Sequence, residues 1–98
     1  MATDLQLDLD IQQITESIEK MERHFKLIIF NDDHHSMGQV VKQLIKAVKC
    51  TAAQAMVFMN EAHTTGSAVV KVGGKEECET ARKILEAIDL LTDLVEDT

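Results

Sequence analysis

Hydrophobic and polar positions follow one another along the chain in blocks that predict short strands and helices. The first clear block is Leu27–Phe30, an uninterrupted apolar run with the length of a buried strand, which we place at residues 26–31. Asn31, Asp32 and Asp33 come next, and these turn-forming side chains mark where the strand ends. The pattern therefore predicts a cluster of amide and carboxylate groups at the C-terminal end of a buried strand.

Two capping signatures predict two consecutive helices. Ser36 begins the first at the spacing of a capping box, in which its hydroxyl accepts a backbone N–H bond and the Gln39 side chain reaches back to the cap. The same spacing recurs at Thr51. The apolar stripes that follow are Val40, Val41, Leu44, Ile45 and Val48 in the first helix and Ala55, Met56, Met59, Ala62 and His63 in the second. We expect the first helix to end near residues 49–50 and the second at Gly66, a common C-terminal stop.

The C-terminal third predicts a second strand, a third helix and a last element that the local pattern leaves open. The β-branched run at residues 67–72 is typical of a strand, and Gly73-Gly74 of a turn. A helix is predicted from Lys75, with its apolar stripe at Cys78, Ala81, Ile84, Leu85 and Ile88. Residues 91–96 could continue this helix or turn back as a strand beside the first, and acidic residues in so short a strand favour the helix. The fold class is α/β (α+β), with the order β-α-α-β-α before the open element.

Residues 1–24 form an acidic lead with a mixed pattern. Apolar side chains alternate with polar ones at Leu5, Leu7, Leu9 and Ile11, and then take helical spacing at Ile14, Ile18 and Met21. A terminal segment of mixed period is typical of a flexible extension, or of a segment that orders on a partner. We therefore divide the chain into an N-terminal extension, residues 1–24, and a folded domain, residues 25–98.

Composition and charge restrict the class of partner. The 98 residues make one small domain, and the 45% hydrophobic and 28% charged content is ordinary for such a domain. The net charge of −7 argues against nucleic acid, whose phosphates would be repelled. The sequence has neither an apolar run of about 18 residues nor a basic leader with an apolar core, so we expect no membrane span and no signal peptide. We expect a monomer. The bacterial cytoplasm and the plastid stroma are both open as its location, and the lack of an Arg/Ser-rich transit peptide favours the bacterial cytoplasm.

The titratable side chains form no recognisable catalytic or metal-binding pattern. Carboxylates and imidazoles, which are common metal ligands, occur at Asp32, Asp33, His34, His35 and His63. Neighbouring side chains in a turn point apart, however, which leaves His63 as the one remote ligand. Cys50 and Cys78 lack the spacing of a zinc site, so we expect reduced thiols. With no nucleophile arrangement and no Gly-rich phosphate loop, we predict no metal, no cofactor and no enzymatic activity.

The same residues also have simpler interpretations. The run from Asn31 to Asp33 is typical of a turn that leads into a helix, and His63 on an apolar stripe is typical of a hydrogen-bonded core histidine. Methionines on helical stripes ordinarily fill a core, and we predict that role for Met56 in particular. His34 is expected to be exposed.

Four motifs occur together over residues 25–96. They are Asn31-Asp32-Asp33 with Met37 four residues later, Val40-Val41 at the start of the first helix, Met59-Asn60-Glu61-Ala62-His63 followed by Gly66, and Glu77-Cys78-Glu79-Thr80. In this combination the chain resembles the ClpS family, adaptors that deliver substrates to a Clp ATPase and its protease. The resemblance implies three helices packed on a three-stranded antiparallel sheet in the order β-α-α-β-α-β, and hence a last strand at residues 91–96.

The resemblance also implies a function. ClpS adaptors bind proteins whose N-terminal residue is Leu, Phe, Tyr or Trp and deliver them to a Clp-type AAA+ ATPase. By motif position, the residues that would bind the free α-amino group are Asn31, Asp32 and His63. Those that would line the side-chain pocket are Met37, Val40 and Met59, with His35 at the position of a small polar residue. Contacts with the ATPase would involve Glu76, Glu79, Arg82 and the extension 1–24.

The assigned residues suit that ligand chemically. An ammonium group has three N–H donors, and the Asn31 carbonyl, the Asp32 carboxylate and a neutral His63 ring offer three acceptors. Met59 and His63 are four residues apart and therefore share one face of a helix. Methionine is flexible and polarisable, so a pocket lined with it can accept both aliphatic and aromatic side chains.

The chain departs from the family pattern next to these positions. His34-His35-Ser36 replaces the usual aromatic-Thr-Pro before Met37, and His35 is bulkier than threonine and can carry a charge. Gln39 replaces a usual Phe, and Ala81-Arg82 stands where the family commonly has Lys. Substrate range, pH response and the ATPase-facing surface are therefore the properties that the resemblance fixes least.

Two other functions fit the same architecture. One is a protein of this fold that has lost N-degron recognition and modulates or inhibits the ATPase, although the intact Asn31, Asp32 and His63 argue against it. The other is a protein-binding module like the C-terminal domain of the ribosomal stalk protein. That domain would use a basic, Gly-rich helix hairpin, which the first helix here does not provide.

Overall fold

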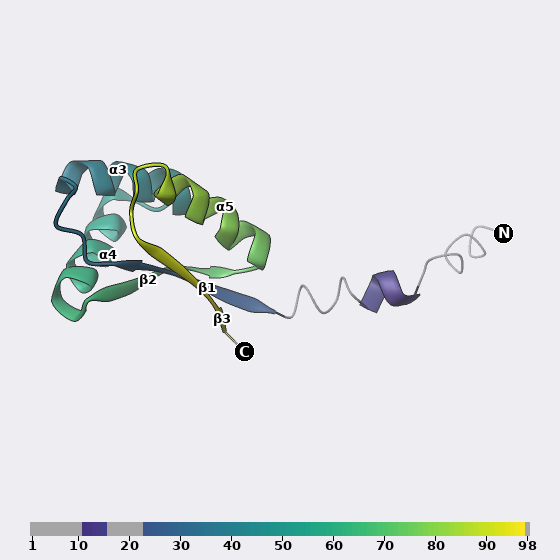
Figure 1. Ribbon diagram of the computed structural model, residues 1–98. Helices are drawn as coiled ribbons and strands as arrows, with labels where there is room; N and C mark the ends of the chain where they lie inside the picture. The colour runs from purple at the N-terminus through teal and green to yellow at the C-terminus, as the bar shows by residue number, and fades with distance from the viewer. Residues whose placement is uncertain (1–10, 16–22, 98) are drawn as a thin grey trace.

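A computed structural model describes residues 11–15 and 23–97 of the chain. The folded part contains β1 (His24–Phe30), α3 (Met37–Val48), α4 (Ala52–Thr65), β2 (Ser67–Gly73), α5 (Lys75–Glu86) and β3 (Thr92–Asp97) (Figure 1). Residues 11–15 are helical, as their spacing predicts, whereas Ile18, Met21 and most of the extension 1–24 lie outside the described residues. None of the helices described is long and apolar enough to cross a membrane.

The apolar run of the sequence forms the central strand of an antiparallel sheet with the order β2-β1-β3. In the register of the sheet, Leu27 lies opposite Lys71 on one side and Leu94 on the other. The β1–β2 register shifts between Leu27 and Ile28. Strand β1 runs from residue 24 to residue 30, whereas the predicted range was 26–31. It starts earlier than predicted because His24 pairs with Asp97, and it ends one residue earlier, at Phe30.

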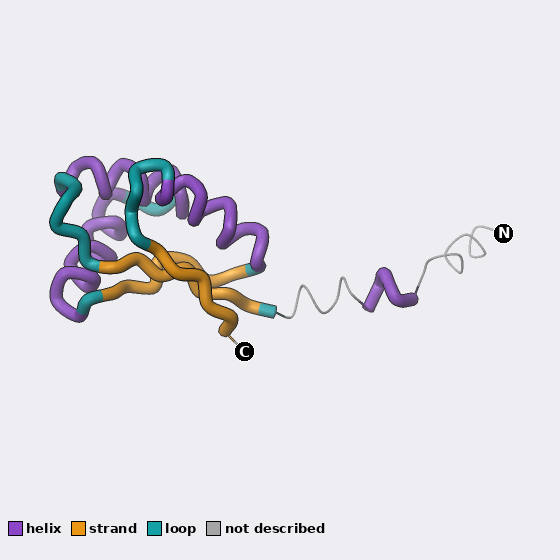
Figure 2. The backbone as a smooth tube through the Cα atoms, in the orientation of Figure 1, coloured by secondary structure: helices purple, strands orange, loops and turns teal. Residues whose placement is uncertain are grey.

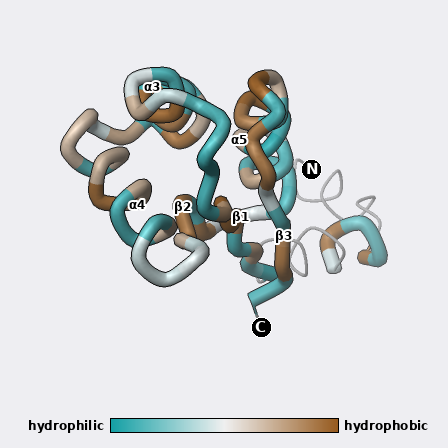
Figure 3. Tube along the Cα trace, turned by 60° about the vertical axis from the view of Figure 1, so that its left-hand side comes forward, coloured by the Kyte–Doolittle hydropathy of each residue, from teal (hydrophilic) through white to brown (hydrophobic). Residues whose placement is uncertain are grey.

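The three helices lie on one face of this sheet (Figures 1 and 2). Helix α5 packs on β1 and β3, α4 packs on β2, and α3 packs against both helices. The largest fully buried side chains come from β1, α3 and α5: Leu27, Ile29, Leu44, Leu85 and Cys78. The core is therefore aliphatic. Figure 3 shows that the loop from β1 to α3 is, in contrast, a hydrophilic stretch, whereas the helices alternate between hydrophilic and hydrophobic positions.

The last element is a strand, as the family resemblance implies and against the local preference for helix. Helix α5 ends at Glu86, before the predicted stripe residue Ile88, and Asp89 takes a left-handed conformation with φ of 60°. The chain then reverses, buries Leu90 and pairs with β1. Pairing supplies the backbone groups of β1 with a second set of partners, and this outweighs the weak strand propensity of the two aspartates.

The helix ends follow the capping signals with one exception. Thr51 forms a complete capping box, with Gln54 N donating to Thr51 Oγ1 (3.1 Å) and Thr51 N donating to Gln54 Oε1 (3.0 Å). At α3 the Ser36 hydroxyl accepts from Gln39 N (3.2 Å), but the predicted reciprocal bond from the Gln39 side chain is not formed in the described structure. Helix α4 ends at Gly66, whose φ of 96° favours glycine.

Replacing Thr51 with alanine is expected to lower the free energy of unfolding by about 0.5–2 kcal/mol, because the variant loses the side-chain acceptor for the first turn of α4. Ala53→Ser, an exposed change in the same helix turn, is the matched control and should change stability by less than about 0.5 kcal/mol. Chemical denaturation of both variants measures the difference. Equal midpoints for the two would show that the box does not stabilise α4.

Candidate functional site

The end of β1 is held between two other parts of the fold. Phe30 N donates to the Leu91 carbonyl (3.3 Å) on the β3 side, and Asn31 N donates to the Gly66 carbonyl (3.1 Å) at the end of α4. Residues 31–35, which we call the polar corner, therefore begin at a fixed point beside the C-terminal turn of α4. This arrangement brings the corner close to His63, which belongs to that last turn.

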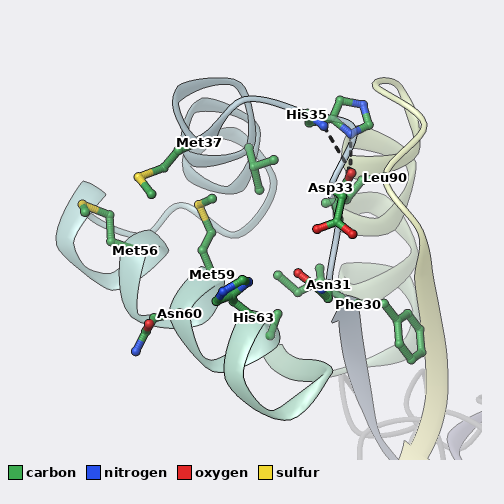
Figure 4. Close-up of a pocket in the computed structure, with 14 residues that line it drawn as sticks. Phe30, Asn31, Asp33, His35, Met37, Met56, Met59, Asn60, His63 and Leu90 are labelled. Carbon is green, nitrogen blue, oxygen red and sulfur yellow. Dashed lines mark hydrogen bonds and ion pairs between the residues drawn. The ribbon is translucent and has the colours of Figure 1, made fainter.

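A cavity of about 550 Å³ opens between the polar corner, the start of α3 and α4 (Figure 4). All seven residues that the sequence assigned to the amine site and the side-chain pocket line it. The complete lining is Ile29, Phe30, Asn31, Asp32, Asp33, His35, Met37, Val40, Met56, Met59, Asn60, Ala62, His63 and Leu90. The structure thus joins parts of the chain that are more than 30 residues apart into one site.

The cavity has an apolar wall and a polar wall. Met37 and Val40 of α3 and Met59 of α4 provide apolar surface, and Figure 4 shows Met59 and His63 projecting from the same side of α4 toward the corner. This confirms the shared helix face that their spacing predicts. Opposite them, the polar corner supplies carbonyl and carboxylate oxygens.

Three polar side chains of the cavity have no partner among the described residues. The side chains of Asn31, Asp33 and His63 form no hydrogen bond or ion pair with any residue that the structure describes, and all three residues are exposed to solvent. Their acceptor atoms are therefore available to a ligand, which would replace water there. His63 is not the hydrogen-bonded core histidine of the simpler interpretation.

Asp32 is bound mainly to its own loop. Its Oδ1 accepts from the backbone N–H of His34 (2.6 Å) and of His35 (3.2 Å), and its Oδ2 accepts from the ring Nδ1 of His35. Partial burial acts to raise the pKa of Asp32, but these bonds outweigh it and hold the pKa below its ordinary value. Asp32 therefore stays ionised and organises the corner.

His35 joins the corner to the connection between α5 and β3. Its Nδ1 contacts Asp32 Oδ2, and its Nε2 contacts the backbone carbonyl of Ile88. The bond to Asp32 raises the pKa of His35 above its ordinary value; partial burial opposes this, and the Ile88 carbonyl and the charge of Asp89 add to it. His34, as predicted, is exposed.

Sequence reasoning missed several residues of the cavity. Asp33 received no role of its own, yet it lines the cavity, and Figure 4 shows its carboxylate between Asn31 and His35. Met56 is not core filler as predicted: it is 51% exposed and lines the cavity, because the inner face of α4 is formed by the small side chains of Ala55 and Ala62. The signal for Asp33, a second carboxylate directly after Asp32, was present in the sequence.

The residues expected to face the ATPase lie on α5. Glu76 and Glu79 line a second hollow of about 770 Å³, together with Arg23, His24 and the turn at Gly73-Gly74. Arg82 does not line it; its Nε lies 2.8 Å from Glu86 Oε1 and 3.1 Å from Thr92 Oγ1.

Among the described residues, no group of three or more His, Cys, Asp and Glu side chains could hold a metal ion.

Comparison with known proteins matches this chain to two groups. The family model of the ATP-dependent Clp protease adaptor protein ClpS matches residues 20–90. The chain is 32% identical over 68 residues to the ClpS adapter of Synechocystis, an alignment that covers 68% of this chain and 69% of that adapter. It is also 32% identical over 69 residues to the human E3 ubiquitin-protein ligase UBR1, which covers 70% of this chain but spans only 4% of the ligase.

A solved structure shares the fold. Agrobacterium tumefaciens ClpS2 bound to L-phenylalaninamide aligns with a TM-score of 0.71 and 23% sequence identity, covering 76% of this chain and 98% of that chain. At this identity the likeness establishes the fold. Together with the family model and the cyanobacterial relative, it shows that the chain belongs to the ClpS family of ATP-dependent Clp protease adaptor proteins.

Proposed function

We propose that the protein binds the free N-terminus of proteins that begin with a bulky apolar residue and delivers them, in the bacterial cytoplasm, to a Clp-type AAA+ ATPase without catalysing a reaction itself. The observation that carries this proposal is the composition of one cavity, in which unpaired acceptors face a wall rich in methionine. An N-terminal residue has the matching pair of features, an ammonium group and, one carbon away, a large side chain.

The ammonium group would be bound by acceptors of the polar corner and α4. Asn31, Asp33 and His63 carry unpaired acceptor atoms, as described above. A carboxylate has about four lone-pair positions, and Asp32 uses three of them within the corner, which leaves one for a ligand. We therefore assign Asn31, Asp33 and His63 as the main contacts, with Asp32 adding at most one bond.

Charge favours a cation at this position. A protonated His35 neutralises Asp32 through their ion pair, so the negative charge of Asp33 is left uncompensated in the cavity. A hydrogen bond to a charged group contributes about 1.5–3 kcal/mol, and a buried Leu or Phe side chain about 1.5–3 kcal/mol more. After the cost of ordering the ligand, an affinity in the micromolar range, near −8 kcal/mol, is expected. An adaptor must also release its cargo, which such an affinity allows.

Fluorescence-polarisation titration with short peptides tests the proposal. Peptides that begin with Leu, Phe, Tyr or Trp should bind with micromolar affinity, and those that begin with Val or Arg more weakly, because they bury less apolar surface. Asp33→Asn and His63→Ala should each weaken binding by about tenfold or more, since the first removes the negative charge that faces the ammonium and the second removes an acceptor. Asp93→Asn makes the same chemical change on the exposed side of β3 and should leave affinity unchanged.

Two results would contradict the proposal. If the bulky apolar peptides bind no better than a peptide that begins with Gly, the apolar wall is not a side-chain pocket. If Asp33→Asn and Asp93→Asn behave alike, the polar corner does not bind the amine. The interpretation left would be a ClpS-fold protein that acts on the ATPase without recognising N-termini.

The ATPase contact is a separate part of the proposal. The hollow lined by Glu76 and Glu79 lies at the Gly74 end of α5, whereas the cavity lies at the other end of β1, by the polar corner. A substrate in the cavity would thus leave the α5 surface free for the ATPase. The extension 1–24, which precedes this end of the sheet in the chain, would add to that contact.

A further inference from the structure

The contacts of His35 require a particular protonation state. Both of its partners, the Asp32 carboxylate and the Ile88 carbonyl, are acceptors only. A neutral imidazole has one N–H and can donate to only one of them, whereas an imidazolium donates to both. The two contacts together therefore fit a doubly protonated ring, and we call the arrangement of Asp32, His35 and the Ile88 carbonyl the His35 bridge.

The bridge connects two segments that are far apart in the chain. His35 and Ile88 are separated by 53 residues, and the bond between them joins the polar corner to the connection that leads from α5 to β3. The corner itself begins at Asn31, the first of the acceptors assigned to the amine site. A change at the ring is therefore transmitted directly to the position of the amine site.

The charged groups around the ring come from three elements. The corner itself supplies Asp32 and Asp33, the α5–β3 connection supplies Asp89, and α4 supplies His63 across the cavity. Helix α3 contributes only Met37 and Val40 to the cavity lining. Acidic groups of the polar corner and of the α5–β3 connection thus surround the ring, and they favour its positively charged form.

We propose that His35 is a positioning residue of the amine site: its imidazolium fastens the polar corner to the Ile88 carbonyl and holds the site in its binding geometry while the ring carries both protons. The proposal rests on the proposed function, because it concerns the same site. It predicts that this protein loses affinity for N-terminal residues as the ring loses its second proton.

The direction of the pH effect follows from the raised pKa of His35. A protonated group whose pKa is higher in the folded state stabilises the folded geometry. For a histidine this stabilisation is complete below the ordinary value of about 6.5 and is lost as pH rises through the raised value. Loss of the proton leaves a nitrogen lone pair facing the Ile88 carbonyl, so the bridge opens on that side. Deprotonation of His35 also removes a positive charge near the bound ammonium, and this effect by itself would raise the affinity for the peptide. That charge is already paired with Asp32, however, and salt screens it.

The test is the affinity of a Phe-initiated peptide from pH 5.5 to 8.5 at about 1 M salt, where the Debye length is about 3 Å. Wild type is compared with His35→Gln, which keeps one amide donor but does not titrate. The same peptide is used with both proteins, so the ratio of the two affinities at each pH cancels effects common to both and reports the substitution at position 35. Wild type should bind about five- to tenfold more tightly than His35→Gln at pH 5.5, and the advantage should disappear by pH 8.5.

His34→Gln is the matched control, because the neighbouring histidine is exposed and contributes only its backbone N–H to Asp32. Its pH profile should follow the wild type. A constant ratio of wild type to His35→Gln across the pH range would overturn the proposal. Absence of peptide binding to wild type at every pH would instead overturn the proposed function.

A ligand-free measurement reads the bridge directly. Ring ¹⁵N chemical shifts of the full chain, assigned by loss of the His35 signals in His35→Gln, should show both nitrogens protonated at pH 5.5 and should report the pH at which the second proton is lost. The titration midpoint should lie above about 6.5 and should fall in Asp32→Asn. A midpoint at or below about 6.5, or one that does not fall in Asp32→Asn, would show that the bridge does not exist, whatever the peptide data show.

Discussion

Acetylating the α-amino group of a Leu- or Phe-initiated peptide is expected to lower its affinity for this protein by about 10⁴-fold or more. Acetylation removes the positive charge and two of the three donors, so that Asp33, Asn31 and His63 would face a neutral amide. A site built from hydrogen-bonding groups rejects an analogue that leaves those groups unpaired, because they have lost water and gained no partner. From a micromolar start, the acetylated peptide would not bind measurably.

Competition against a labelled Phe-initiated peptide measures this effect. The acetylated peptide should fail to compete at concentrations up to the millimolar range. A peptide with an N-methylated amine keeps its charge and two donors, and should therefore fall between the free and acetylated forms. Competition by the acetylated peptide within about tenfold of the free one would mean that the apolar wall alone supplies the binding, and the assignment of the polar corner would be abandoned.

Replacing Leu44 with alanine is expected to lower the free energy of unfolding by about 2–5 kcal/mol, a large part of the stability of so small a domain. Leu44 is 0% exposed and belongs to α3, which packs against both other helices. Its truncation removes apolar contacts and leaves a hole between those elements. In a domain of 60–100 residues this corresponds to a fall in Tm of roughly 10–30 °C.

Leu91→Ala makes the same substitution at a position that is 67% exposed. It should change stability by less than about 0.5 kcal/mol. Thermal unfolding followed by circular dichroism compares the two variants. If they have similar Tm values, the helices are not packed on the sheet around Leu44 as described, and the wall of the cavity formed by α3 would have to be placed differently.

The position of the cavity has a clear physical origin. Strand β1 is fixed on both edges by β2 and β3, so the polar side chains that terminate it start from an immobile base. Two helices, each begun by a hydroxyl cap, then bring Met37, Val40 and Met59 opposite that base. A site on rigid elements holds its acceptors in place before the ligand arrives, which lowers the ordering cost of binding.

The elements whose signals are local were determined by the sequence. Leu27–Phe30 forms the central strand, Ser36 and Thr51 begin their helices, and Gly66 ends one, because each of these signals depends on residues within one or two turns of chain. The shared face of Met59 and His63 follows in the same way from the helical repeat. The motif combination added the fold and the last strand through its resemblance to a family.

What only the tertiary structure decided depends on contacts between distant segments. Strand β3 forms because β1 offers an unpaired edge, which no property of residues 92–97 alone reveals. Met56 lies in the cavity because α4 turns its alanines inward. Of the two adjacent aspartates, Asp32 is bonded to its own loop, whereas Asp33 has no side-chain partner among the described residues. The bond of His35 to the Ile88 carbonyl spans 53 residues. Periodicity reports which face of an element is apolar, whereas the partner that meets each polar group is set by how the elements pack.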